Sequence, residues 1–315
     1  MPYPYYIDII NDRAARDPVD YAHECEAIFD RKVDETAATL AERVEDANCR
    51  VVLLSGPSGS GKTTTSHKIC DALERIGVHA ITVSMDEYYI TPSSENYPRT
   101  EDGELDRESP FALDLDLLND HFTKLDNGEE ICVPHFDFAK QARDPSSVMP
   151  IKLQRDEIVI YEGIHALNDI LADGHPNAFK LYISARSDIM HYGKLCFKRT
   201  WSRLLRRVVR DEHFRGIGAA ATLSMWAIVR DGEKKFISPF KYKADLLFDS
   251  SMGYEVPVMK QFALKALSDV PDGTDRLDEL RMLLPSLLEF HDIDASCVPP
   301  ASILREFIGG GIYNE

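Results

Sequence analysis

The sequence predicts an α/β protein built on a parallel β-sheet with helices on both faces. Short apolar segments that suit buried strands alternate along the chain with longer amphipathic segments that suit helices. This alternation is typical of parallel sheets whose strands are joined by helical crossovers. The first apolar segment also leads directly into a glycine-rich turn and a helix. Such a strand–turn–helix unit is the usual setting of a phosphate-binding loop.

The glycine-rich turn has the full spacing of that loop and predicts a P-loop NTPase fold. Residues 51–66 read VVLLSGPSGSGKTTTS. Glycines let successive backbone N–H groups turn towards one cluster of phosphate oxygens, and the helix that begins near Lys62 adds the positive end of its dipole. An ordinary glycine-rich turn is the alternative, but the glycine, lysine and hydroxyl positions all match. We expect ATP to be bound by Gly56, Ser58, Gly59, Ser60, Gly61, Lys62, Thr63 and Thr64.

The other elements of the main domain follow in alternating order. Apolar segments that suit core strands lie at 51–55, 79–84, 157–161, 179–183 and 245–248. Segments with the spacing of helices lie at 62–76, 113–126, 188–210 and 218–231. A long polar loop is expected over 91–110, and the prolines of residues 131–154 suggest short β pieces in a small separate region.

Two extensions flank this main domain, which we place at residues 49–265. Residues 18–48 have the pattern of a long amphipathic helix, with apolar positions at Phe29, Val33, Leu40 and Val44. We expect this helix to belong to an N-terminal extension, residues 1–48, that packs on the main domain; a helix that binds a partner is the alternative. A helical C-terminal extension is expected over 266–315, with helices at 274–290 and 301–308.

The composition points to a cytoplasmic protein with small molecules as partners. The 315 residues include 36 Lys and Arg against 53 Asp and Glu, a net charge of −17, which disfavours nucleic acid and anionic membranes. No apolar run approaches the ~18 residues that span a bilayer, and the N-terminus does not resemble a signal peptide. The six cysteines are scattered, as in reduced cytoplasmic proteins. Whether copies of the chain form a homo-oligomer stays open.

Two carboxylates follow predicted strands at the sheet edge where ligands bind in open α/β folds. Asp86 follows the second strand, and Glu162 follows the third. We expect Asp86 to act as the base that accepts a proton from an attacking hydroxyl; an aspartate that caps a turn is the alternative. Thr63 and Glu162 offer a hydroxyl and a carboxylate oxygen, so both are expected to hold Mg²⁺.

The basic residues of this acidic chain are concentrated between positions 194 and 215. A solvated, salt-bridged helix is one interpretation of this segment. The other is a lid, at about residues 190–230, that closes arginines over the transferring phosphoryl group, and we prefer it because the planar guanidinium grips phosphate oxygens in pairs. Arg207 and Arg210 are therefore expected to act in catalysis with Lys62 and Asp86.

Six motifs in order resemble the uridine kinase and phosphoribulokinase family of phosphate-loop kinases. They are GPSGSGKTT, MDEYY, VPHFDF, IVIYEGIHAL, RLLRRVVRDEHFRG and KYKADLLF, and they span roughly residues 50–260. The chain looks closest to bacterial uridine kinase-like nucleoside kinases, without the small TGS domain that those often carry. The resemblance implies a five-stranded parallel core, ATP with Mg²⁺, and transfer of the γ-phosphoryl group to a primary hydroxyl.

The resemblance also implies which residues bind the acceptor, in loops and in the small β region. Asp86 matches the catalytic base, and Asp106 matches an acid that holds sugar hydroxyls. Tyr88 and Tyr89 lie in the motif that carries the base. The lid arginines of the family are matched by Arg207, Arg210 and Arg215.

The sequence departs from uridine kinases where those enzymes recognise the base. Phe136 and Gln141 stand at positions that hold a tyrosine and a histidine, and Ile217 and Met225 replace an arginine and a glutamine. These changes remove hydrogen bonds that could define a base. The expected acceptor is a nucleoside such as uridine or cytidine. A kinase of another diol-bearing sugar or polyol is the first alternative, and a nucleotide-binding regulator with little turnover is the second.

Overall fold

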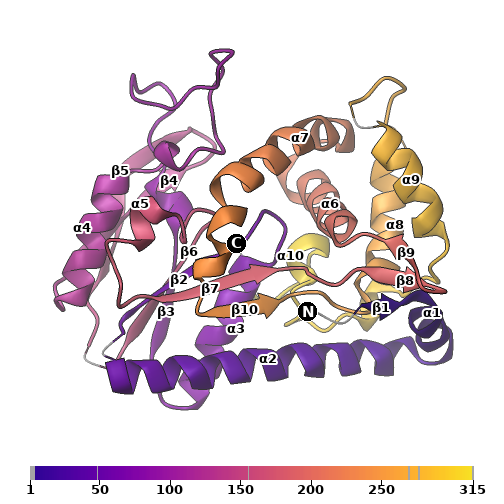
Figure 1. Cartoon of the computed structure of the whole chain (residues 1–315), viewed down its shortest axis with the longest axis horizontal. Coiled ribbons are helices and arrows are strands. Elements are labelled where there is room, and N and C mark those ends of the chain that lie inside the picture. The colour runs from indigo at the N-terminus through magenta and orange to yellow at the C-terminus, as the bar shows by residue number, and fades with distance from the viewer. Residues whose placement is uncertain (1–3, 48, 155, 269, 276, 314–315) are drawn as a thin grey trace.

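A five-stranded, all-parallel sheet forms the centre of the molecule (Figure 1). The computed structural model describes residues 4–47, 49–154, 156–268, 270–275 and 277–313. In spatial order the strands are β10 (Leu246–Asp249), β7 (Phe179–Ser184), β2 (Val51–Ser55), β6 (Ile158–Glu162) and β3 (Ala80–Ser84). Every neighbouring pair is parallel. The five predicted core strands and their parallel arrangement are confirmed.

Both faces of the sheet are buried, because the side chains of each strand alternate between two hydrophobic clusters. In β2, Val52 and Leu54 belong to the larger cluster, whereas Val51 and Leu53 belong to the smaller one. The larger cluster includes side chains of α2 (Pro18–Ala47), α3 (Lys62–Arg75), α6 (Arg199–Arg210) and α8 (Glu255–Leu267). The smaller includes those of α4 (Leu115–Asp126), α5 (Asp169–Ala172), β4 (Ile131–Asp137) and β5 (Ala142–Ile151).

The predicted N-terminal helix is α2, which runs along one side of the molecule below the sheet and α3 in Figure 1. Phe29, Val33 and Leu40 are at most 2% exposed and pack in the larger cluster. The Phe29 ring meets Phe248 of β10 edge-on, with 5.2 Å between ring centroids. The predicted end of the helix at Asn48 lies outside the described residues. The apolar stripe of α2 thus covers the main sheet rather than facing solvent.

A hairpin replaces the first part of the helix predicted over 188–210. Its strands are β8 (Ile189–His191) and β9 (Lys194–Phe197). The turn between them places Tyr192 and Gly193 at φ angles of 46° and 74°, in the left-handed region that a helix interior excludes and that two-residue hairpin turns require. The basic helix α6 therefore begins only at Arg199. Strand β1 (Tyr5–Tyr6), which precedes α1 (Ile7–Arg16), pairs in parallel with β8.

The C-terminal part contains one long helix that the sequence pattern did not indicate. Val256, Val258 and Met259 of α8 are all at most 1% exposed, so this helix lacks the one-sided apolar pattern of a surface helix. The helices predicted at 218–231, 274–290 and 301–308 correspond to α7 (Ala219–Phe236), α9 (Leu277–Leu288) and α10 (Arg305–Ile308). Short helical turns lie at η1 (Met85–Tyr88), η2 (Pro110–Ala112), η3 (Asp211–Arg215), η4 (Ser238–Lys243) and η5 (Ala295–Cys297).

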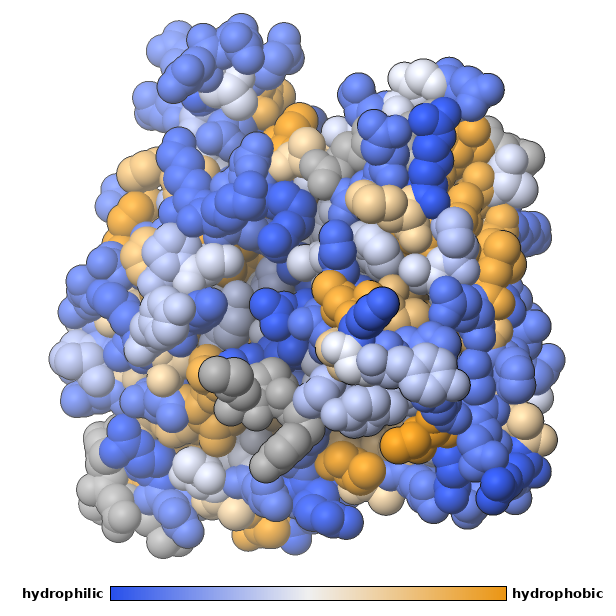
Figure 2. All heavy atoms as spheres, turned by 45° about the vertical axis from the view of Figure 1, so that its right-hand side comes forward, coloured by the Kyte–Doolittle hydropathy of each residue, from blue (hydrophilic) through white to orange (hydrophobic). Residues whose placement is uncertain are grey.

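Hydrophilic residues dominate the face of the molecule in Figure 2, and the apolar residues on it form small separate groups. Within the described ranges, no helix combines the length and the apolar character that crossing a bilayer requires.

Candidate active site

The glycine-rich turn joins the end of β2 to the start of α3, in the middle of the sheet. Gly59 and Gly61 have φ angles of +73° and +80°, which residues with a side chain rarely adopt. Gly56 is required for a different reason: a Cβ atom there would lie 2.0 Å from the backbone oxygen of Ile183 on β7. The loop is thus wound tightly at the carboxyl end of the central strand, and the N-terminus of α3 opens beside it. This is the geometry expected of a phosphate-binding loop.

Arginines of α6 hold the backbone carbonyl groups of this loop. Arg203 donates from Nε and Nη2 to the Ser58 oxygen, at 3.1 and 2.9 Å. Arg206 donates from Nη1 to the Gly59 oxygen at 3.3 Å, and Arg207 donates from Nη1 to Ser58 Oγ at 3.0 Å. These bonds hold the carbonyl oxygens of Ser58 and Gly59, while the N–H of Ser60 is used within the loop by the Pro57 oxygen at 3.2 Å.

Two of these arginines are themselves neutralised by buried glutamates. Arg206 is fully buried and donates to both carboxylate oxygens of Glu255, each at 2.6 Å. Its guanidinium also lies 5.3 Å from the centre of the Phe307 ring. Arg203 pairs in the same way with Glu233 of α7, whose side chain is 1% exposed. Bidentate pairs of this kind fix the position of a guanidinium group.

A second group of arginines converges on one buried carboxylate that the sequence analysis did not single out. Asp211 is fully buried, and its oxygens lie 3.3 Å from Arg207 Nε, 3.8 Å from Arg210 Nε and 3.7 Å from Arg215 Nη1. The hydroxyl of Thr222 donates to it at 3.1 Å. Burial lowers the pKa of Arg207, against the opposing effect of Asp211. The predicted lid arginines are therefore gathered at the end of α6, next to the loop.

The two residues predicted to hold the metal lie side by side. Thr63 Oγ1 donates to Glu162 Oε1 at 3.3 Å, and Glu162 is 6% exposed. Burial raises the pKa of Glu162 to about 7, against the lowering effect of Lys62, which shows that desolvation dominates there. A hydroxyl and a carboxylate oxygen suit Mg²⁺, which takes few protein ligands and completes its shell with water and phosphate oxygens. Among the described residues, no cluster of three or more His, Cys, Asp or Glu could hold a metal by itself.

Asp86, the residue predicted to be the base, follows the strand beside that of Glu162. The register of the sheet pairs Glu162 with Leu54 of β2 on one side and with Ser84 of β3 on the other. Asp86 follows Ser84 by two residues, is exposed, and donates its N–H to Ser84 Oγ at 3.3 Å. Burial raises the pKa of Glu162, Lys62 lowers it, and the charge of Asp86 raises it, so Asp86 lies close enough to Glu162 to act on its charge.

Tyr88 does not have the predicted role at the acceptor site. Its side chain is fully buried in the smaller cluster, and its hydroxyl contacts His121 Nδ1 at 2.8 Å and Tyr161 OH at 3.2 Å. The short helix η1 turns Tyr88 towards the core and leaves Asp86 outside. The assignment of Tyr88 to substrate binding is therefore corrected to a role in the core.

Gln141 is also placed differently from the expectation. It has a φ of 54° at the tip of the β4–β5 hairpin, and its Nε2 donates to the Phe138 oxygen at 2.8 Å. The amide therefore closes its own turn instead of pointing to a bound acceptor. The predicted contact is corrected, because the hairpin register could not be read from the sequence.

An aromatic cluster lies beside Asp86. The Phe136 ring is 3% exposed and lies 5.9 Å from Tyr89 and 5.1 Å from Phe138, between ring centroids. Glu87 holds this cluster in place, since its Oε2 accepts the Phe136 N–H at 2.7 Å. Phe138, which the sequence analysis passed over, is 54% exposed. Tyr89 and Phe138 thus offer an apolar wall near the base, whereas Phe136 supports them from below.

The polar loop over 91–110 brings Asp106 and a second acid, Glu108, to the same region. Asp106 Oδ1 accepts the Glu108 N–H at 3.2 Å. Glu108 packs against Gly232 of α7 so closely that a Cβ there would lie 2.6 Å from Glu108 Cβ. Burial raises the pKa of Glu108 to about 7; Arg207 lowers it, and Glu233, Asp106 and Asp86 raise it. Glu108 therefore lies close enough to Arg207, Asp106 and Asp86 to be affected by their charges, although no motif identified it.

A carboxylate from the C-terminal segment contacts the start of α3, which the sequence did not indicate. Glu306 of α10 accepts hydrogen bonds from Thr64 at Oε2, at 3.0 Å from the hydroxyl and 3.5 Å from the backbone nitrogen. Its side chain is 4% exposed. The sequence indicated a helix here but contained no signal that it would reach the phosphate-binding loop.

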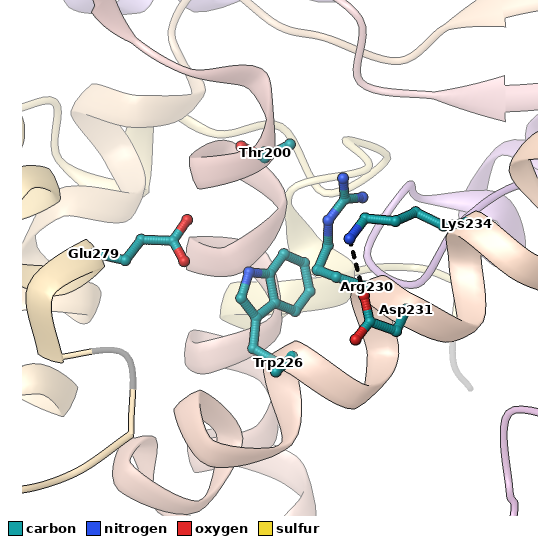
Figure 3. Close-up of a pocket in the computed structure, with 7 residues that line it drawn as sticks. Thr200, Trp226, Arg230, Asp231, Lys234 and Glu279 are labelled. Atoms are coloured by element: carbon teal, nitrogen blue, oxygen red, sulfur yellow. Dashed lines mark hydrogen bonds and ion pairs between the residues drawn. The ribbon is translucent and has the colours of Figure 1, made fainter.

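A separate cavity of about 260 Å³ lies between α6, α7 and α9, away from the loop (Figure 3). The Trp226 indole and the side chains of Arg230, Lys234 and Glu279 line it, and Lys234 is paired with Asp231 at 2.9 Å. Its mixture of positive and negative side chains indicates no particular ligand.

The raised pKa of Glu108 predicts a pH-dependent stability difference. The pKa of Glu108 is about 7 in the folded protein, whereas the ordinary value of 4.5 applies to the unfolded chain. As the pH rises, the unfolded chain therefore loses the Glu108 proton first. The wild type should therefore lose stability relative to Glu108→Gln between about pH 4.5 and 7. Urea unfolding without nucleotide should show that the variant gains roughly 1–3 kcal/mol over the wild type from pH 5 to pH 8. A gap that does not change with pH would mean that Glu108 is solvated.

Comparison with known proteins shows the family of the chain. Residues 51–256 match the family described as Phosphoribulokinase / Uridine kinase family. A relative named uridine kinase, from Staphylococcus aureus (strain JH9), is 30% identical over 210 residues, which cover 66% of this chain and 91% of the relative.

Two solved structures are similar over most of their length, and the first of them shares the fold. A putative fructose transport system kinase from Silicibacter sp. TM1040 has a TM-score of 0.51 at 19% identity, over 69% of this chain and 98% of that one. A possible uridine kinase from Bacillus stearothermophilus has a TM-score of 0.45 at 16% identity, over 69% of this chain and 100% of that one. From the sequence match over residues 51–256 we conclude that the chain belongs to the phosphoribulokinase / uridine kinase family of P-loop kinases.

Proposed function

We propose that the chain transfers the γ-phosphoryl group of ATP to a hydroxyl of a small diol-bearing acceptor, of which a nucleoside such as uridine or cytidine is the first candidate. One observation carries the proposal. Thr63, Glu162 and Asp86 follow three neighbouring parallel strands and meet at one edge of the sheet, with the Thr63 hydroxyl 3.3 Å from the Glu162 carboxylate. This arrangement supports the proposal, because phosphoryl transfer requires oxygen ligands for a metal and an accessible base close to each other.

The loop and α3 would bind the triphosphate. Backbone N–H groups between Gly56 and Thr64, together with the positive end of the α3 dipole, favour phosphate oxygens. Lys62, the first residue of α3, would add a charge on the outer phosphates. Mg²⁺, held by Thr63 and Glu162, would supply charge neutralisation at the phosphates. Arg207, Arg210 and Arg215 would add positive charge from the far side of the loop, where Asp211 now gathers them.

Asp86 would act on the acceptor. Its exposed carboxylate can accept the proton of a hydroxyl as that oxygen attacks phosphorus, and it holds the hydroxyl in position before the reaction. The proton then resides on a carboxylate oxygen of Asp86. The new phosphoester bond forms on the acceptor oxygen as the bond between the γ-phosphorus and the β–γ bridging oxygen breaks, and ADP leaves. The protein contributes to this step mainly by orienting the two reactants and by excluding water from them.

The acceptor pocket favours recognition of a sugar-like part over recognition of a base. Asp106 and Glu108 offer carboxyl groups that suit hydroxyls, and Tyr89 with Phe138 offers an apolar surface. Phe136 has no polar atom on its ring, and Gln141 is bound to its own hairpin. The named uridine kinase relative supports a nucleoside acceptor, whereas this side-chain set supports a free sugar or polyol equally well.

A nucleotide-binding regulator with little turnover is the rival function. The buried loop contacts of α6 and the docked C-terminal segment would suit a protein that responds to nucleotide by changing a surface. Such a regulator would need the phosphate-binding loop but not the base, so the two functions differ in what they require of Asp86.

Replacement of Asp86 separates these functions. Asp86→Asn keeps the shape of the side chain but removes its ability to accept a proton, so phosphoryl transfer should fall by about 100-fold or more while the affinity for ATP changes little. Asp102→Asn, the same change on the exposed part of the 91–110 loop, is the matched control and should keep full turnover. A much weaker affinity for ATP in Asp86→Asn, with turnover retained at saturating ATP, would assign Asp86 to the nucleotide instead.

Turnover with a panel of acceptors tests the substrate class. We expect a low catalytic efficiency with uridine, because a base that loses one or two buried hydrogen bonds loses about ten- to a hundredfold in selectivity. Uridine, cytidine, purine nucleosides, free sugars and cyclic polyols should be compared with ATP as donor. An exclusive preference for uridine or cytidine would show that Phe136 and Gln141 do not weaken base recognition.

A further inference from the structure

The Glu306 carboxylate lies at the N-terminus of α3, directly after the phosphate-binding loop. Its Oε2 accepts from the Thr64 hydroxyl at 3.0 Å and approaches the Thr64 backbone nitrogen at 3.5 Å. Thr64 is the third residue of α3, and its N–H belongs to the group that cradles phosphate in loops of this pattern. An anion of the protein itself therefore lies where an anion of the nucleotide is expected.

The segment that carries Glu306 is firmly docked. Ile303, Leu304 and Phe307 are fully buried in the larger cluster, and the ring of Phe307 lies under the Arg206 guanidinium. Lys68 of α3 donates to the Ala301 oxygen at 2.9 Å. Removing three buried apolar side chains from the core would be far more costly than rotating one glutamate side chain. The helix α10 therefore stays in place when Glu306 moves.

A second partner for the carboxylate lies within reach. Arg210 Nη1 is 3.8 Å from Glu306 Oε1, and both side chains are almost fully buried. A modest rotation of the Glu306 side chain would strengthen this ion pair and take the carboxylate away from Thr64. The same rotation would let phosphate oxygens replace it at the N-terminus of α3.

From these contacts we infer that Glu306 is an internal competitor of the nucleotide: its carboxylate occupies a phosphate position at Thr64 and must turn towards Arg210 before ATP or ADP binds. The inference rests on the nucleotide site proposed above. It assigns to the C-terminal segment a role in setting nucleotide affinity, because part of the binding free energy is used to displace a charge-assisted hydrogen bond. The Arg210 side chain then pairs with Glu306 in the nucleotide-bound protein.

Calorimetric titration of the full chain with ATP and with ADP tests the inference. Glu306→Gln removes the charge at nearly constant shape and should bind both nucleotides about ten- to a hundredfold more tightly than the wild type. Glu306→Asp keeps the charge but shortens the reach, and should also bind more tightly. Glu289→Gln removes an exposed carboxylate elsewhere in the C-terminal extension and should leave the affinity unchanged.

The possible results separate the two proposals. Equal or weaker nucleotide binding by both Glu306 variants, with melting temperatures that show them folded, would overturn the competitor role and leave the kinase proposal standing. An equal gain in Glu289→Gln would overturn it too, because the effect would then come from net charge. Absence of nucleotide binding in every protein, the wild type included, would overturn both proposals.

Discussion

The candidate site depends on the buried arginines of α6, which bind the phosphate-binding loop from behind. Arg203 and Arg206 donate to the backbone oxygens of Ser58 and Gly59, and each is paired with a buried glutamate. Removing one partner of such a pair typically costs about 3–5 kcal/mol, since it leaves an uncompensated buried charge. The loop is thus tied to α7 through Glu233 and to α8 through Glu255. The backbone of the loop is therefore held in its wound form by the protein itself.

The arginines of the basic segment, residues 194–215, therefore fall into two groups with different roles. Arg203 and Arg206 are structural, because their donors are used by the loop and by glutamates. Arg207, Arg210 and Arg215 gather on Asp211 at the end of α6, where η3 begins. We therefore expect the moving part of the proposed lid to begin near Asp211, whereas α6 itself stays fixed. The C-terminal segment joins this second group, since Glu306 approaches Arg210.

The sequence was sufficient for the sheet and for the nucleotide side of the site. A strand followed by a tightly spaced glycine loop is a local pattern, so the positions of Gly56, Lys62 and Thr63 could be predicted without any tertiary contact. Asp86 and Glu162 followed from the rule that ligands lie at the carboxyl ends of parallel strands. Local periodicity failed at 188–198, where a two-residue turn makes a hairpin, and at α8, which is buried on nearly all sides.

The acceptor side of the site could not be predicted in the same way, because it depends on how loops fold back. The short turn η1 determines that the Tyr88 side chain points into the core. The register of the β4–β5 hairpin determines which group the Gln141 amide contacts. Glu108 is more than twenty residues away from Asp86 along the chain, and Glu306 is more than two hundred residues away from Thr64. No spacing rule relates such positions, so only the assembled structure brings them together.

Hydrogen exchange of α6 tests the central claim, that this helix is a fixed support of the loop and not the moving lid. The account predicts slow exchange of the amides of residues 203–209 in the free protein, with little change on addition of ATP and Mg²⁺, while residues 211–218 gain protection. Exchange of α6 as fast as that of the exposed 91–110 loop, or protection that develops in α6 only when ATP is added, would contradict it.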